Sequence, residues 1–159
     1  MNLIDVKSPA DLKGLSISEL TDLTAQARQA LMTKVSEHGG HFGPPMGAAE
    51  MIMALHYVFN SPVDKIVYDV SHQSYVHKMV TGRALAFLDH DHYDDVTGYT
   101  DPTESEHDFF NIGHTSTSIS LASGLATARN LKGDSENIIA IIGDGSLSGG
   151  EAFEGLDYA

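Results

Sequence analysis

The chain has no cysteine and few basic residues, and each absence excludes some functions. Without cysteine there is no disulfide framework and no thiol chemistry. The 9 lysines and arginines oppose 22 aspartates and glutamates, which gives a formal net charge of −13. A field of this sign disfavours nucleic acids and anionic membrane surfaces as partners. It also disfavours an anionic cofactor, unless a metal ion or local donors reverse the field.

Long apolar runs are missing as well, and none of those present is long enough to span a bilayer. The first residues, MNLIDVKSPADLKGL, contain acids and lack the continuous apolar segment of a signal peptide. We therefore expect a cytoplasmic protein with no membrane partner. The 159 residues, of which 42% are hydrophobic, are enough for about one domain with a core.

The most informative stretch is 137–150, NIIAIIGDGSLSGG. Its short β-branched run, Ile138–Ile142, stops at a glycine, which is typical of a strand buried on both faces. A helical pattern with Phe153 and Leu156 follows the glycines. The stretch thus predicts a strand, a tight turn and a helix. In a parallel α/β sheet such a turn lies at the carboxyl end of its strand, where ligands bind, and helix N-termini there favour anions.

Asp144, between Gly143 and Gly145, indicates which ligand this turn binds. A bare carboxylate repels a diphosphate, whereas a hard divalent cation such as magnesium between them makes the contact attractive. A Rossmann fingerprint is excluded because Ser148 stands where its last glycine belongs. The turn therefore predicts a metal–diphosphate site, with a structural turn and a solvated aspartate as the alternative interpretation.

The remaining elements are predicted from caps, breakers and periodicity. Ser16-Ile17-Ser18-Glu19 is a capping box that opens a helix, and Gly39-Gly40 ends it. Further along we expect a helix over 46–59, a strand over 66–70, a helix that stops at Gly82, and a helix over 115–131. Residues 1–15 are expected to be an irregular lead-in and 89–112 a long acidic surface loop. The fold class is α/β, with a largely parallel sheet and helices on both faces.

Three histidines lie in loops beside glycines or at predicted strand ends: His41, His72 and His114. Histidine suits proton transfer near neutral pH and contact with phosphate oxygens. Each one alone is more often structural, but three at element ends indicate a functional site.

The other histidines have plainer interpretations. His56 and His77 fall inside helical patterns, which favours packing or surface positions. His90, His92 and His107 lie among many acids without metal-ligand spacing, so we interpret them as part of a solvated loop.

Three strings occur in order: SEHGGHFGPPMGAAEMIMALHYVFNSPVDKIVYDVSHQSYVHKMVTGR, then ESEHDFFNIGHTSTSISLASGLATARNLKG, then IIAIIGDGSLSGGEAFEGL. They resemble the N-terminal part of the 1-deoxy-D-xylulose-5-phosphate synthase family, within the transketolase-like thiamine-diphosphate enzymes. The resemblance covers residues 15–159. It implies that 1–159 is the first portion of a diphosphate-binding domain, incomplete at its C-terminus.

The resemblance also implies roles for single residues. His41 matches a histidine near the reacting carbon of thiamine diphosphate that helps to move protons, and His72 matches a histidine that contacts this cofactor. Gly113-His114-Thr115 matches a segment that lines the cofactor site. Asp144 matches the first Mg²⁺ ligand, and Gly145-Ser146 matches the pair that contacts the diphosphate.

Some positions depart from the family pattern. Ser71 stands where the family usually has glycine before His72, and Ser74 and Val76 also differ from the usual residues. The loop 98–103, GYTDPT, lacks the basic residues that the family usually carries there. A paralogue that uses another donor or acceptor therefore stays open.

The resemblance implies a transferase that converts pyruvate and glyceraldehyde 3-phosphate into 1-deoxy-D-xylulose 5-phosphate and CO₂, a precursor of isoprenoids, thiamine and pyridoxal. Transketolase-like two-carbon ketol transfer and a non-catalytic cofactor-binding subunit are the alternatives. A helix still runs near Ala159 without a cap, so we expect a fragment, a split gene product or one subunit. The resemblance implies that the second metal ligand, an asparagine of the same metal motif, lies beyond Ala159. The activating glutamate is expected on a pyrimidine-binding domain, in the rest of the enzyme or in a second chain. We therefore expect the chain to be inactive alone and the complete enzyme to be a homodimer.

Overall fold

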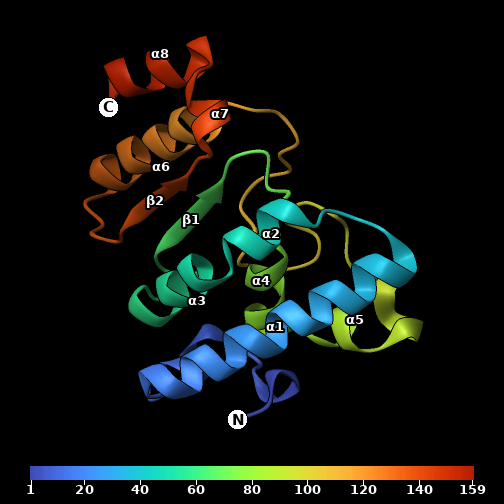
Figure 1. Ribbon diagram of the computed structural model, residues 1–159. Coiled ribbons are helices and arrows are strands. Elements are labelled where there is room, and N and C mark those ends of the chain that lie inside the picture. The colour runs from blue at the N-terminus through green and yellow to red at the C-terminus, as the bar shows by residue number, and fades with distance from the viewer. The chain divides into compact units, whose positions relative to one another are not determined.

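The computed structural model describes residues 1–159 as two compact units. Unit 1 comprises Met1–Asn60 and His72–Gly98, and unit 2 comprises Ser61–Ser71 and Tyr99–Ala159. The α-helices of unit 1 are α1 (Ile17–His38), α2 (Gly43–Gly47), α3 (Ala49–Val58), α4 (Tyr75–Lys78) and α5 (Leu85–Leu88) (Figure 1). Unit 2 contains β1 (Lys65–Tyr68), α6 (Ser118–Lys132), β2 (Ile138–Ile141), α7 (Asp144–Leu147) and α8 (Gly150–Tyr158).

Helix α1 is the longest element of unit 1 and begins and ends as predicted. The Ser16 N–H donates to the Glu19 carboxylate at 2.8 Å, and the Glu19 N–H donates to the Ser16 hydroxyl at 3.3 Å. The helix ends before Gly39, whose φ of +89° lies in the left-handed region that favours glycine. The residues spaced along one helical face, Leu20, Leu23, Ala27 and Leu31, are buried, and Val35 at the end of the same face is half-buried.

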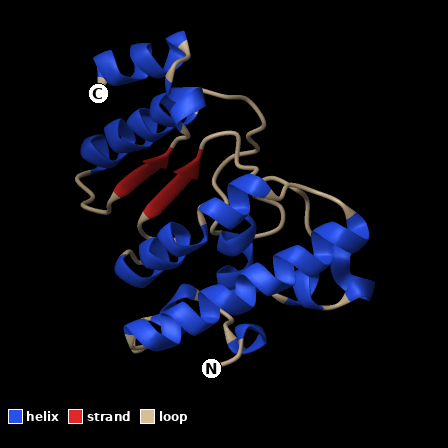
Figure 2. Ribbon diagram, viewed as in Figure 1, coloured by secondary structure: helices blue, strands red, loops and turns tan.

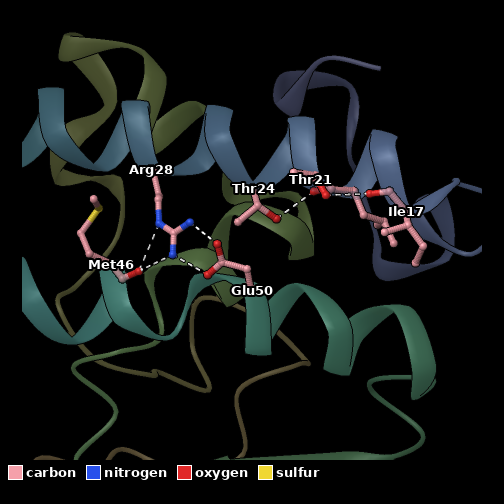
Figure 3. Close-up of polar contacts among 7 residues, drawn as sticks. Ile17, Thr21, Thr24, Arg28, Met46 and Glu50 are labelled. Atoms are coloured by element: carbon pink, nitrogen blue, oxygen red, sulfur yellow. Dashed lines mark hydrogen bonds and ion pairs between the residues drawn. The ribbon is translucent and has the colours of Figure 1, made fainter.

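Arg28 connects α1 to the next two helices of unit 1 (Figure 3). Its guanidinium donates to the Met46 carbonyl, with Nη2 at 2.9 Å, and forms an ion pair with Glu50. The prediction of one helix over 46–59 is wrong, because the segment is divided into α2 and α3 around Ala48. The first of these begins earlier than predicted, since two prolines fit the first turn of a helix.

The lead-in of unit 1 is more regular than expected. It contains 3₁₀ helices at Leu3–Asp5 and Pro9–Leu12, with Leu3, Val6 and Leu12 buried. Gly82 has a φ of +90°, and a Cβ there would lie 2.7 Å from the Lys7 carbonyl oxygen. The lead-in therefore packs too closely on the π-helical turn Met79–Arg83 for a larger residue at position 82.

Unit 2 is built on a small parallel sheet, which confirms the predicted α/β class. β1 pairs with β2 in register, from Lys65 opposite Ile138 to Tyr68 opposite Ile141. Helix α6 packs against both strands, and α8 packs against α6 (Figure 2). A core cluster of Val67, Ile112 and Ala122 lies between α6 and the sheet.

Two details of unit 2 differ from the prediction. β2 is not buried on both faces, because Ala140 is exposed and Ile138 and Ile139 are half-buried. On α8 the side chains of Phe153 and Leu156 are 61% and 51% exposed, whereas Ala152 and Gly155 are buried. The segment is helical as predicted, but small residues rather than large ones face α6.

Two element boundaries differ from the prediction by two or three residues. β1 ends at Tyr68 rather than at position 70, because Val70 and Ser71 have φ values of +58° and +71°, which no strand accommodates. Helix α6 begins at Ser118 rather than at 115, because Ser116 has a φ of +71°. None of the helices combines the length and the apolar character needed to cross a bilayer.

Candidate functional site

In unit 1, the loop after α1 places His41. Gly40 has a φ of +124°, and a Cβ at this position would lie 2.8 Å from the Tyr75 hydroxyl. The same hydroxyl accepts a hydrogen bond from the His41 N–H at 3.2 Å. Only glycine at position 40 leaves room for this contact, so the Gly-Gly-His sequence fixes the backbone that carries the histidine.

His41 and His72 form one cluster in unit 1. Their ring centroids lie 5.4 Å apart in an edge-on arrangement, and both residues are half-buried. The Tyr75 ring lies 6.1 Å from His41. The structure therefore brings together the two histidines predicted as catalytic, in a place where both retain access to solvent.

A cavity of about 280 Å³ adjoins His41 and is lined by Gly39–His41, Tyr75, Tyr93 and Val96–Gly98, among others. Its wall also includes Lys34, which is only 5% exposed. The Lys34 ammonium donates to the carbonyls of Ala86 and Tyr93, both at 2.8 Å. These bonds and the Phe87 ring, whose centroid lies 4.4 Å from Lys34 Nζ, fix the lysine in the wall of the cavity. The sequence did not indicate that Lys34 is buried, because a lysine beside the apolar residues of α1 resembles an ordinary surface lysine.

In unit 2, Gly113-His114-Thr115 lies exposed just before α6. The next residue, Ser116, is buried, and its N–H donates to Asp69 Oδ2 at 3.0 Å. The Ser118 N–H donates to Asp69 Oδ1 at 2.9 Å. Asp69 thereby joins the carboxyl end of β1 to the start of α6, a role that no pattern in the sequence indicated.

Asp69 is 1% exposed and nevertheless charged. Burial raises the pKa of Asp69, but hydrogen bonds from Ser118, Ser146 and other donors lower it by more. Its pKa therefore lies below the ordinary value, and the carboxylate is ionised at neutral pH.

The residues of the predicted metal–diphosphate turn follow β2 directly, and Asp144–Leu147 within them form the one-turn helix α7. Asp144 and Gly145 are exposed, and Ser146 is half-buried. The Ser116 hydroxyl donates to the Ser146 carbonyl at 2.6 Å. Unit 2 thus brings the 113–115 segment and the 144–146 turn together, with Ser116 as the link.

The donor chemistry of this turn fits a hard cation. The Asp144 carboxylate is an oxygen ligand that lies open to solvent, as Mg²⁺ requires. The chain contains no group of three His, Cys, Asp or Glu side chains arranged to hold a metal ion. Asp144 is thus the residue of this turn whose chemistry fits a metal ligand, as the sequence predicts.

Ser71 is a second residue whose role the sequence did not reveal. It is fully buried, and its hydroxyl donates to the Ile112 carbonyl at 2.9 Å. The same hydroxyl accepts from the Thr100 N–H at 3.0 Å. The residue that departs from the family pattern thus holds both the atypical 98–103 loop and the backbone just before Gly113.

The remaining histidines divide into packed and solvated groups. His56 and His77 stack with centroids 5.0 Å apart and are fully buried, which confirms a packing position. His107 is also buried, 2.9 Å from the Ser61 hydroxyl, so its interpretation as solvated was wrong. His90 is exposed and His92 is half-buried, and the Asp95 carboxylate raises the pKa of His92.

Comparison with known proteins gives consistent matches over almost the whole chain. Residues 3–159 match the family model described as 1-deoxy-D-xylulose-5-phosphate synthase. The protein of that name from Caldanaerobacter subterraneus is 53% identical over 155 residues, which cover 98% of this chain and 25% of the relative. The one from Symbiobacterium thermophilum is 50% identical over 159 residues, covering 100% of this chain and 24% of the relative. The chain thus spans about a quarter of the length of the curated relatives it matches.

Proposed function

The chain belongs to the 1-deoxy-D-xylulose-5-phosphate synthase family, and from this premise we propose that it supplies the diphosphate-binding part of a thiamine-diphosphate-dependent transferase. The proposed reaction condenses pyruvate with glyceraldehyde 3-phosphate and releases CO₂. When bound, thiamine diphosphate supplies the carbon nucleophile and the electron sink for this decarboxylation. The observation that carries the proposal is the turn Asp144–Ser146 at the carboxyl end of β2, tied through Ser116 to the segment 113–115.

Within unit 2, each residue at this strand end has a chemical task in the proposal. Asp144 holds Mg²⁺, which neutralises the diphosphate in a chain of net charge −13. Gly145 and Ser146 contact the diphosphate, and the exposed 113–115 segment lines the cofactor.

Within unit 1, His41 and His72 are the proposed proton carriers. Imidazole exchanges protons near neutral pH, and the 5.4 Å separation lets one reacting group contact both rings. Lys34, fixed by the carbonyls of Ala86 and Tyr93, forms part of the wall of the cavity beside His41.

The proposal extends to partners and location. Complete activity requires the pyrimidine-binding part of the enzyme, in the same protein or in a second chain, and a homodimer is the proposed assembly. We propose that the protein is cytoplasmic, because its first residues lack the apolar segment of a signal peptide.

A product assay on the protein at its full natural length tests the function. We expect 1-deoxy-D-xylulose 5-phosphate and CO₂ from pyruvate and glyceraldehyde 3-phosphate, only with thiamine diphosphate and Mg²⁺ present. Ketol transfer from a ketose phosphate, with no turnover of pyruvate, would replace the proposed reaction by the transketolase-like one. If the protein binds the cofactor but turns over neither donor, the alternative of a non-catalytic cofactor-binding subunit would be supported.

His41→Ala tests the chemical role of the unit 1 cluster. A positioned acid or base contributes roughly 10²–10⁴-fold, so turnover should fall by that order while thermal stability stays near wild type. His92→Ala, which removes a histidine from the acidic loop, is the matched control and should keep full turnover. Equal turnover in both variants would remove His41 from the mechanism.

A further inference from the structure

We propose that Asp69 is a positioning residue that sets the geometry of both cofactor-binding segments of unit 2, acting through Ser116. The inference rests on the proposed function, since it assigns Asp69 to the same site. It goes beyond that function, because Asp69 is 1% exposed and is not itself one of the proposed cofactor or metal ligands.

The first step is the way in which the charge of Asp69 is used. An ionised carboxylate that is 1% exposed is costly unless donors surround it. Here both oxygens are occupied by backbone amides, from Ser116 at 3.0 Å and from Ser118 at 2.9 Å. Because the bonded amides belong to Ser116 and Ser118, they fix the course of the backbone at the start of α6. The segment 113–115 leads directly into Ser116, so its position is fixed as well.

The second step is the conformation of Ser116. It has a φ of +71°, which is unfavourable for a residue with a Cβ and persists only where the surroundings enforce it. The bond from its own N–H to Asp69 Oδ2 enforces it here. Without this bond the backbone would relax, and the Ser116 side chain would point elsewhere.

The third step leads to the metal turn. The Ser116 hydroxyl donates to the Ser146 carbonyl at 2.6 Å, and Ser146 adjoins Gly145 in the turn that carries Asp144. A Cβ at Gly149 would lie 2.0 Å from the Ser116 Oγ, so the chain after the turn also packs against this side chain. One buried carboxylate therefore determines the spacing between the segments that line the cofactor and hold its metal.

A matched control lies at the other end of the same strand. Asp64 is also buried, at 6% exposure, and its Oδ1 accepts from the Asn137 N–H at 2.7 Å and the Asn137 side-chain amide at 2.9 Å. Asp64 links β1 to the start of β2, just as Asp69 links β1 to the start of α6. No proposed cofactor residue lies beside Asp64. A purely structural role for Asp69 predicts that the two substitutions behave alike.

The test compares Asp69→Asn, Ser116→Ala and Asp64→Asn in the protein at its full natural length. Thiamine diphosphate is titrated at saturating Mg²⁺ by calorimetry, and thermal unfolding is followed on the cofactor-free protein. Residues behind metal ligands typically affect affinity or activity by about 10–100-fold, and we expect a loss of that order for Asp69→Asn. Ser116→Ala keeps both amide bonds to Asp69 and should still weaken binding. Asp64→Asn should lower the melting temperature and leave the affinity unchanged.

The outcomes separate this inference from the proposed function. Wild-type protein that binds no thiamine diphosphate overturns both. Wild-type protein that binds, with Asp69→Asn and Ser116→Ala binding equally well despite lower melting temperatures, overturns only the positioning role. If Asp69→Asn fails to fold, the Ser116→Ala affinity decides, since that substitution leaves the start of α6 bonded to Asp69.

Discussion

The two ends of β1 are built in contrasting ways. At the amino end, Asp64 binds Asn137 and Lys65 pairs with Glu136 at 2.9 Å, which closes the start of β1 onto the start of β2. At the carboxyl end, the chain leaves the strand through two residues in the left-handed region. The amino end therefore stabilises the sheet, whereas the carboxyl end holds backbone in conformations that the sheet does not need.

The non-glycine residues with strained backbone are also confined to the carboxyl end of β1 and its hydrogen-bond partners. Val70, Ser71 and Ser116 are the non-glycine residues of the chain with positive φ, and all three lie at the carboxyl end of β1 or are hydrogen-bonded to it. Such a residue costs roughly 1–2 kcal/mol, so their concentration indicates that the backbone there is held for a purpose. Ligands bind at the carboxyl ends of parallel strands, which makes the cofactor the proposed reason.

The largest expected effect comes from Asp144→Asn, which removes the proposed metal ligand at the carboxyl end of β2. Outer-shell changes already cost up to about 100-fold, and loss of a ligand should cost at least that in cofactor affinity at limiting Mg²⁺. Asp134→Asn, before the amino end of β2, is the control and should change nothing. Unaltered Mg²⁺ dependence in Asp144→Asn would return the turn to its structural interpretation.

Gly149→Ala should have the next largest effect. The new Cβ would lie 2.0 Å from the Ser116 Oγ, and overpacking of this kind costs typically about 1–3 kcal/mol in the free energy of unfolding. The neighbouring Gly150→Ala has open space around its Cβ and serves as the control. Chemical denaturation of both variants measures the difference, and equal stabilities would show that the Ser116 contact is loose.

Two substitutions at Ser71 distinguish the contribution of its hydrogen bonds to stability from the cost of its backbone strain. Ser71→Ala removes bonds to Thr100 and Ile112 and keeps the strain, so it should lose roughly 1–2 kcal/mol of stability. Ser71→Gly removes the same bonds but relieves the left-handed strain, so its loss should be smaller by about 1 kcal/mol. If the glycine variant proves the less stable, the conformation at position 71 is not strained.

The smallest effect is expected at the amino end, from Glu136→Gln. Hydrogen bonding from Lys65 lowers the pKa of Glu136, so the ion pair stabilises the fold above the ordinary glutamate pKa. This stability is lost as the pH falls through the folded-state pKa. The variant should be slightly less stable than wild type at pH 7 and equal to it in strong acid. A difference that persists in strong acid would mean that the ion pair is not its cause.

The sequence predicted the parts of this account that depend on local pattern. The run Ile138–Ile142 ending in glycine predicted β2 and its turn, and the capping box predicted α1. Asp69 could not be recognised, because an aspartate after a strand becomes a positioning residue only through amides 47 and 49 residues away. The roles of Ser71 and Ser116 depend on φ values that the residue types do not indicate, and Lys34 depends on carbonyls of α5 and Tyr93.

Hydrogen–deuterium exchange of the protein at its full natural length, with and without thiamine diphosphate and Mg²⁺, tests the central claim most directly. The claim predicts that the cofactor slows exchange in peptides covering 113–118 and 143–149. Peptides covering 61–65 and 134–138, at the amino ends of the two strands, should exchange at the same rate with and without it. Protection confined to the amino-end peptides, or none in the carboxyl-end segments when the cofactor is bound, would contradict the account.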